Sequence, residues 1–184
     1  MHEPRLAPAA SPYPPEVQGW LDRTMPAGVA PLTLFTTLAR DPRLFGKFMS
    51  AGLLDRGNLT LRQREIVIDR VTARCGSAYE WGVHVTFFGE RVGLTAPQIE
   101  SLAVGNADDP CWGEEERLLI RLCDALHATC DVDDALWSAL SECFSDEALI
   151  ELLMLAGFYR TVSYLTNALR LAPEAYAAPL PGRS

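Results

Sequence analysis

The sequence predicts an all-α fold, a compact bundle of about eight helices. Apolar residues recur at helical spacing through most of the chain, and capping pairs such as Thr60 with Gln63 mark helix starts. The period-two alternation typical of strands is absent.

The 184 residues, 48% of them hydrophobic, suffice for one domain with a substantial core. Residues 1–14 are rich in proline and alanine and are expected to form a disordered arm. A single domain is expected over 15–172, followed by a loose, proline-rich tail over 173–184.

Proline and glycine residues indicate the boundaries of the first three helices. Pro15 suits the first position of a helix, so the first is expected to begin there. The second is expected over 32–38, ending before Pro42, and the third over 43–54, stopped by Gly57.

Capping patterns define the central pair of helices. Thr60 and Gln63 form a capping-box pattern, which predicts a fourth helix reaching about Arg74. Gly76 breaks this helix, and a fifth is expected over 77–93.

The remaining helices follow the same logic. Thr95 caps a short sixth helix, and 114–130 is strongly amphipathic. A helix over 131–143 precedes the last one, which is capped by Ser145 and extends to Leu171.

Charge and composition exclude several classes of function. The formal charge is −8 and the pI about 4.9, which disfavours nucleic-acid binding. No secretory signal and no uninterrupted apolar run of membrane-spanning length is recognised, so no membrane partner is expected. An odd number of cysteines without such a signal indicates a cytoplasmic protein with reduced thiols: Cys75, Cys111, Cys123, Cys130 and Cys143.

Glu65, Glu80 and His84 form the candidate catalytic group. His84 lies one helical turn after Glu80, between the aromatic residues Trp81 and Phe88. Burial lowers the pKa of a histidine and a nearby carboxylate raises it, so we expect His84 to titrate near neutrality, where acid–base catalysis is efficient.

Structural explanations compete with this one. Glu80 could only close a capping box with Ser77, and His84 could be a hydrogen-bonded core residue. Glu65 could be a surface residue that pairs with Arg62 or Arg70.

The stretch from Glu65 through Arg70 and 75–81 to His84 resembles the core motif of the carboxymuconolactone decarboxylase/AhpD-like family. Residues 152–168 resemble the closing helix of that family, and the similarity extends over about 30–172. The resemblance implies an all-helical fold that assembles as trimers or hexamers, with sites near subunit contacts.

In the peroxidase branch of that family, a Cys-x-x-Cys pair precedes the histidine, and a glutamate lies nineteen residues before it. Glu65 and His84 match the glutamate and histidine, whereas Ser77 and Glu80 occupy the cysteine positions. A dithiol cycle needs both thiols, so the disulfide mechanism of that branch is not expected. The pattern is closer to the non-redox branches, including the decarboxylases.

The resulting hypothesis is a cofactor-independent acid–base enzyme acting on a small carboxylate- or carbonyl-bearing metabolite, by decarboxylation, isomerisation or hydration. Glu65 would orient His84, and Glu80 would assist it. Substrate contacts are expected from Arg70, Tyr79, Trp81 and Arg160, with an arginine holding the carboxylate.

Two other functions stay open. One is a peroxidase-related antioxidant activity that uses Cys75 with an external thiol, and the other is a non-catalytic ligand-binding role. Cys123, His127 and Cys130 share a helix face that could bind a metal. No fourth ligand is evident, however, and no bound metal is expected. The expected partners are a small molecule and other copies of the chain, as a dimer, trimer or hexamer.

Overall fold

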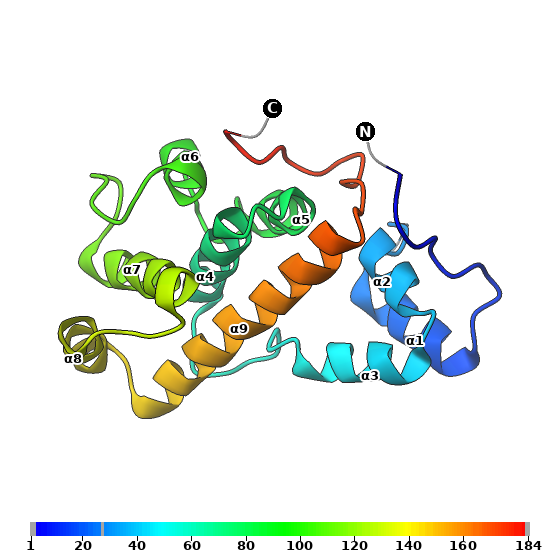
Figure 1. Ribbon diagram of the computed structural model, residues 1–184, viewed down its shortest axis with the longest axis horizontal. Helices are drawn as coiled ribbons and strands as arrows, with labels where there is room; N and C mark the ends of the chain where they lie inside the picture. The colour runs from blue at the N-terminus through cyan, green and yellow to red at the C-terminus, as the bar shows by residue number, and fades with distance from the viewer. Residues whose placement is uncertain (1–2, 27, 183–184) are drawn as a thin grey trace.

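The computed structural model describes residues 3–26 and 28–182, which form nine α-helices and no strand. Residues 1–2, 27 and 183–184, which include the outer ends of the expected arm and tail, lie outside the described residues. The predicted all-α class is confirmed (Figure 1). The helices are α1 Pro15–Thr24, α2 Thr33–Leu38, α3 Pro42–Ala51, α4 Leu61–Arg74, α5 Ala78–Phe88, α6 Ala96–Val104, α7 Glu114–Thr129, α8 Asp134–Cys143 and α9 Asp146–Ala168.

The central element is α4, which packs against α5, α6, α7 and α9. Residues 64–72 are all buried, although they include charged side chains. A helix buried on all sides belongs in the interior of a bundle, and Figure 1 shows α4 enclosed by its neighbours. Charged residues on α4 therefore face protein partners.

Side-chain caps set the boundaries that matter for the site. Thr60 and Gln63 form the predicted capping box at the start of α4. Cys130 adopts a left-handed conformation with φ of 58° and ends α7. Asp133 then caps α8, which begins three residues later than expected.

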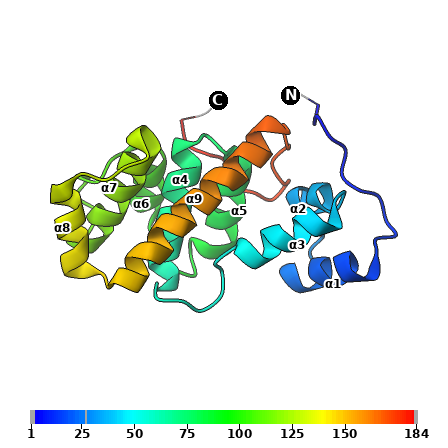
Figure 2. The ribbon, with the colours of Figure 1, turned by 60° about the horizontal axis from the view of Figure 1, so that its bottom comes forward.

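The helices α1, α2 and α3 form a separate unit to one side of the main bundle (Figure 2). They share a small core of their own, made of Val17, Leu21, Ala39 and Phe45. Phe35 and Phe48 extend toward the main core, and the Phe48 ring lies 5.1 Å from that of Phe158 on α9. A pocket forms between this unit and the faces of α5 and α9.

The described parts of both terminal segments make hydrogen bonds with the helices. Within residues 3–14, the Ala9 amide donates to the carbonyl of Thr36 at 2.9 Å. In the C-terminal segment, Glu174 accepts a 2.6 Å hydrogen bond from the Thr33 amide. The Ala178 amide donates to Thr86 Oγ1 at 2.9 Å. These contacts give the described part of the C-terminal segment a path across α5.

The last helix, α9, has 23 residues and is long and apolar enough to cross a membrane by length and composition alone. Its inner face packs against α4 and α5, as in the core helix of a globular bundle. That inner face consists of Ala148, Leu149, Leu152, Leu155, Ala156, Tyr159, Val162, Ser163 and Thr166.

Candidate active site

His84 lies between two carboxylates in the interior of the bundle. Its Nδ1 atom is 2.8 Å from Oε2 of Glu65, which reaches it from α4. Its Nε2 atom is 3.4 Å from Oε1 of Glu80, one turn earlier on α5. All three side chains are buried. The predicted group is therefore brought together in one place, and Glu65 is a buried partner of the imidazole.

Local structure positions Glu80 for this contact. Ser77 caps α5 by accepting a 3.4 Å hydrogen bond from the Glu80 amide. The Ser77 amide itself donates to the carbonyl of Thr72, so Glu80 does not close a capping box. Its side chain is free to meet His84.

Aromatic rings fix the imidazole from two sides. Phe88 stacks on it with ring centroids 5.4 Å apart, and Tyr159 meets it edge-on at 5.1 Å. His84 is 4% exposed, and such low-dielectric surroundings strengthen the electrostatic interactions of its imidazole with the glutamates.

The electrostatics of His84 differ from the sequence-based expectation. Burial lowers the pKa of its imidazole, but the charge and hydrogen bond of Glu65, followed by those of Glu80, raise it to about 10. The value lies above the neutral range expected from the sequence because two carboxylates, Glu65 and Glu80, contact the imidazole at 2.8 and 3.4 Å. At neutral pH His84 is therefore an imidazolium, a proton donor rather than a base.

A third carboxyl group lies behind this site. Asp69 is one turn after Glu65 on α4, and both its oxygens are buried without a hydrogen-bond partner among the described residues. Burial raises its pKa well above the usual value, and the negative charge of Glu65 adds to the effect. The protonated form of Asp69 is thereby favoured, which limits the negative charge around His84.

Glu80 and His84 open onto a pocket of about 690 Å³ between the main bundle and the α1–α3 unit. Small-molecule sites typically occupy about 300–1,000 Å³. The second carboxylate oxygen of Glu80, Oε2, is buried and has no hydrogen-bond partner within residues 3–26 and 28–182. His84 and Glu80, whose Oε2 atom has spare hydrogen-bonding capacity, therefore both line a ligand-sized pocket.

Two residues expected to touch the substrate do not line this pocket. The Tyr79 hydroxyl donates to Glu174 in the C-terminal segment and accepts a 3.0 Å hydrogen bond from the Leu34 amide. The Trp81 side chain is fully buried in the main core. Tyr79 thus connects the C-terminal segment to α2, and Trp81 anchors α5 in the main core.

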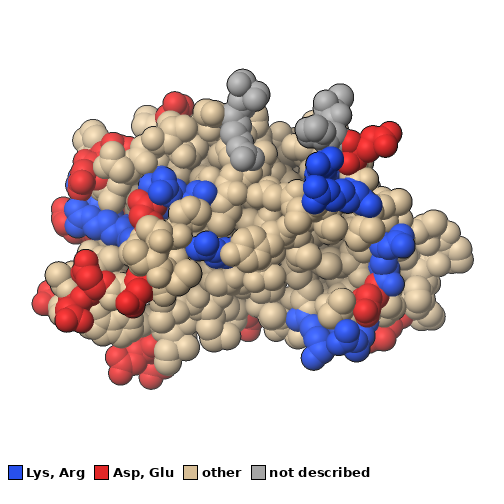
Figure 3. Space-filling view, in the orientation of Figure 1, with Lys and Arg blue, Asp and Glu red and all other residues tan. Residues whose placement is uncertain are grey.

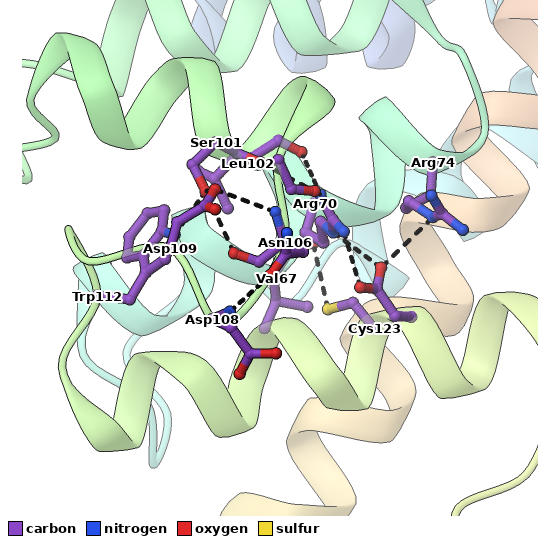
Figure 4. A network of polar contacts seen from close by, with 12 residues as sticks. Val67, Arg70, Arg74, Ser101, Leu102, Asn106, Asp108, Asp109, Trp112 and Cys123 are labelled. Carbon is purple, nitrogen blue, oxygen red and sulfur yellow. Dashed lines mark hydrogen bonds and ion pairs between the residues drawn. The ribbon is translucent and has the colours of Figure 1, made fainter.

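Arg70 is also remote from the pocket, because it is bound within the protein. Its Nε and Nη2 atoms form a two-pronged ion pair with Asp124, at 2.8 and 2.7 Å. Its Nη1 atom donates to the carbonyls of Ser101, Leu102 and Gly105. Figure 4 shows Arg70 inside this network, with Arg74 beside the same carboxylate. Arg70 joins α4, α6 and α7 and has no free donor face for a substrate.

Arg160 and Cys75 lie together in a second, smaller pocket of about 170 Å³. The sulfur of Cys75 is 3.9 Å from Nδ1 of His127, and Arg160 donates to the carbonyls of Leu126 and His127. Burial raises the pKa of the Cys75 thiol, although Ser163, Arg160 and Arg74 lower it. The net effect disfavours the reactive thiolate.

The face formed by Cys123, His127 and Cys130 does not gather into a metal site. Within residues 3–26 and 28–182, no three histidine, cysteine or acidic residues lie close enough to hold a metal ion. Cys123 is buried and directs its thiol toward the carbonyl of Val67, while Cys130 is exposed.

Comparison with known proteins supports the fold. No family model and no curated protein matches the sequence. Among solved structures, an uncharacterised peroxidase-related protein with an alkylhydroperoxidase AhpD core, from Ralstonia eutropha JMP134, superposes with a TM-score of 0.82. The two chains are 19% identical, and the similarity covers 95% of each.

Two further structures give the same result. A peroxidase-related protein from Silicibacter sp. TM1040 has a TM-score of 0.80 at 19% identity, over 95% of this chain and 96% of that one. The debrominase Bmp8, solved as a cysteine-to-alanine variant in complex with 2,3,4-tribromopyrrole, has a TM-score of 0.75 at 16% identity, over 96% and 94%. The chain therefore has an AhpD-like fold.

Four pocket or site residues escaped the sequence interpretation. Tyr159 and Asp69 have no role in the sequence-based hypothesis, although the four-residue spacing of Asp69 from Glu65 places both carboxyl groups on one face of α4. Arg23 and Arg91 line the pocket from segments far apart in the chain, and no local pattern marks them.

Proposed function

We propose that this protein is a cofactor-independent acid–base enzyme for a small carbonyl-bearing molecule. The observation that carries the proposal is the buried Glu65–His84–Glu80 group, which meets a pocket of about 690 Å³. Buried titratable groups with strongly shifted pKa values, placed at a pocket, are typical of catalytic sites. The solved AhpD-like neighbours, which include a debrominase, are compatible with an enzyme.

The geometry suggests a division of roles. Glu65 accepts the Nδ1 proton of His84 and fixes the orientation of the ring. Oε2 of Glu80 would take a proton from the carbon next to the carbonyl group. His84 would donate its Nε2 proton to the carbonyl oxygen as negative charge develops there. The product of this step is the enol, whose reprotonation at another carbon gives an isomer. Decarboxylation of a 3-keto acid, or addition of water to a conjugated double bond, would likewise form an enol, because each moves an electron pair to the carbonyl oxygen that receives the proton of His84.

A peroxidase-related function that uses Cys75 is the second candidate. The contact between Cys75 and His127, and the peroxidase-related neighbours, support it. The raised pKa of Cys75 and its location in another pocket argue against its taking part at the His84 site. A third candidate is a binding protein that holds a ligand in the same pocket without reacting with it.

Deuterium incorporation separates these candidates. Phenylpyruvate in D₂O exchanges the hydrogens next to its ketone when a protein catalyses enolisation, and proton NMR records the loss of their signal. We expect exchange above the protein-free rate, and we expect Cys75→Ser to retain it within about twofold, because this substitution leaves the His84 group intact.

Two results would contradict this proposal. A Cys75→Ser variant that loses exchange would point to thiol chemistry. Binding of phenylpyruvate without exchange would support the non-catalytic role.

Assembly with further copies of the chain is part of the same proposal. Ile150, Met154 and Tyr164 are exposed on one face of α9, together with Gly157. Figure 3 shows a largely uncharged surface over this helix. An exposed apolar face of this kind is typical of subunit contacts.

A further inference from the structure

The pocket beside His84 is lined by five phenylalanines, which come from four helices. Phe48 on α3 contacts both Phe35 on α2 and Phe158 on α9, with ring centroids 6.3 and 5.1 Å apart. Phe87 and Phe88 on α5 complete the set. Aromatic walls pack best against a flat, apolar ring, through edge-to-face or offset stacking contacts.

The same pocket has two basic residues in its lining. Arg23 is in the last turn of α1, and Arg91 follows α5, so the α1–α3 unit and the main bundle contribute one each. Both side chains are exposed. Within the described part of the chain, neither forms an ion pair, whereas Arg62, Arg70 and Arg121 do. Two guanidinium groups therefore remain available to a ligand.

The acidic residues of the pocket restrict where an anionic group can lie. Glu80 is deep in the pocket beside His84, and a ligand anion next to it would be repelled. Asp55 is exposed at the lining and has no arginine partner for its side chain among the described residues. A ligand carboxylate is best placed with Arg23 and Arg91, whose planar donors match it.

We infer that the pocket takes an anionic ring compound, with the ring among the phenylalanines and the carboxylate at Arg23 and Arg91. This inference rests on the proposed function for one detail, which is that the reacting end of the molecule faces Glu80 and His84. The anion site thus lies at the junction with the α1–α3 unit, and not at Arg70 or Arg160, which the sequence suggested.

Binding of a matched pair of probes tests the inference. The anion 3-phenylpropanoate and the neutral 3-phenylpropanamide have the same ring, and neither has a ketone that could react. Calorimetry should show tighter binding of the anion to the natural protein. The double variant Arg23→Gln with Arg91→Gln should bind the anion about threefold to tenfold more weakly, and the amide unchanged.

Lys47→Gln is the matched control. Lys47 is exposed on α3 and carries the same charge, but it does not line the pocket. Its replacement should leave both affinities as they are. Propanoate, which has the acid without the ring, should bind far more weakly than 3-phenylpropanoate.

Several results would overturn the inference. They are equal binding of anion and amide by the natural protein, no binding of either, and an equal loss of anion binding in Lys47→Gln. The assay measures binding without turnover. A negative result would therefore contradict the inference about the ligand without bearing on the proposed function. Unchanged anion binding in the double arginine variant, with exchange activity that still needs His84, would remove the anion site and leave the acid–base proposal standing.

Discussion

Replacing His84 by glutamine is expected to lower deuterium exchange into phenylpyruvate by about 10²–10⁴-fold. The glutamine amide can still donate a hydrogen bond to Glu65, so the buried carboxylate keeps a partner. It has no proton to give, because an amide does not titrate in this range. The fold should therefore remain while proton transfer stops, as judged by proton NMR for exchange and circular dichroism for helix content.

The same substitution at His127 provides the control. His127 lies in the second pocket with Cys75, away from Glu65 and Glu80, and is more exposed than His84. His127→Gln should exchange at the natural rate. Equal loss of activity in both variants, or full activity in His84→Gln, would rule out the proposed role of His84.

The largest effect on stability is expected at Arg70. Arg70→Met should lower the free energy of unfolding by about 3–5 kcal/mol, because it breaks the ion pair of the buried Arg70 with the partly exposed Asp124 and leaves buried backbone carbonyls without donors. The carbonyls of Leu102 and Gly105 lie at the end of α6 and depend on Nη1 of Arg70. Asp124 would keep only its 3.4 Å contact with Arg74. Urea unfolding followed by circular dichroism measures the loss.

Arg121→Met is the matched control for this prediction. Arg121 pairs with Asp108 at the same 2.7 Å distance, but both side chains are largely exposed. Water and salt screen such pairs, so the loss should stay below about 1 kcal/mol. A similar small loss for Arg70→Met would show that the buried network does not stabilise the junction of α4, α6 and α7.

Most of the helices could be predicted because their signals are local. Thr60 with Gln63, Asp41 before Pro42 and Ser145 each cap a helix through contacts within four residues. The start of α8 was placed too early because Cys130 takes a left-handed conformation, which no residue type other than glycine signals strongly. The path of the C-terminal segment was missed because Glu174 pairs with Thr33 and Tyr79 across the fold.

The residues of the candidate site likewise separate into those with local sequence signals and those brought together only by the fold. Glu80 and His84 are one turn apart, so periodicity alone put them on one face, and the family resemblance added Glu65. The sequence predicts that Arg70 binds the substrate, because a sequence shows that a residue is charged but does not show which residue pairs with it. Its partner, Asp124, lies 54 residues away on α7. Arg23 and Arg91 were missed for the opposite reason, since only the packing of α1–α3 against α5 brings them to one pocket.

The protonation of His84 is the central claim, and its titration by NMR tests it most directly. A pKa raised to about 10 means that the folded protein binds a proton that the unfolded chain releases near 6.5. The stability that His84 contributes is therefore complete below that lower value and is lost as pH rises toward 10.

The ring signals of His84, identified by their absence in His84→Gln, should remain those of an imidazolium from pH 6 to about pH 9 and change near pH 10. A midpoint between pH 6 and 7 would contradict the account, because a neutral imidazole at physiological pH has no proton to donate.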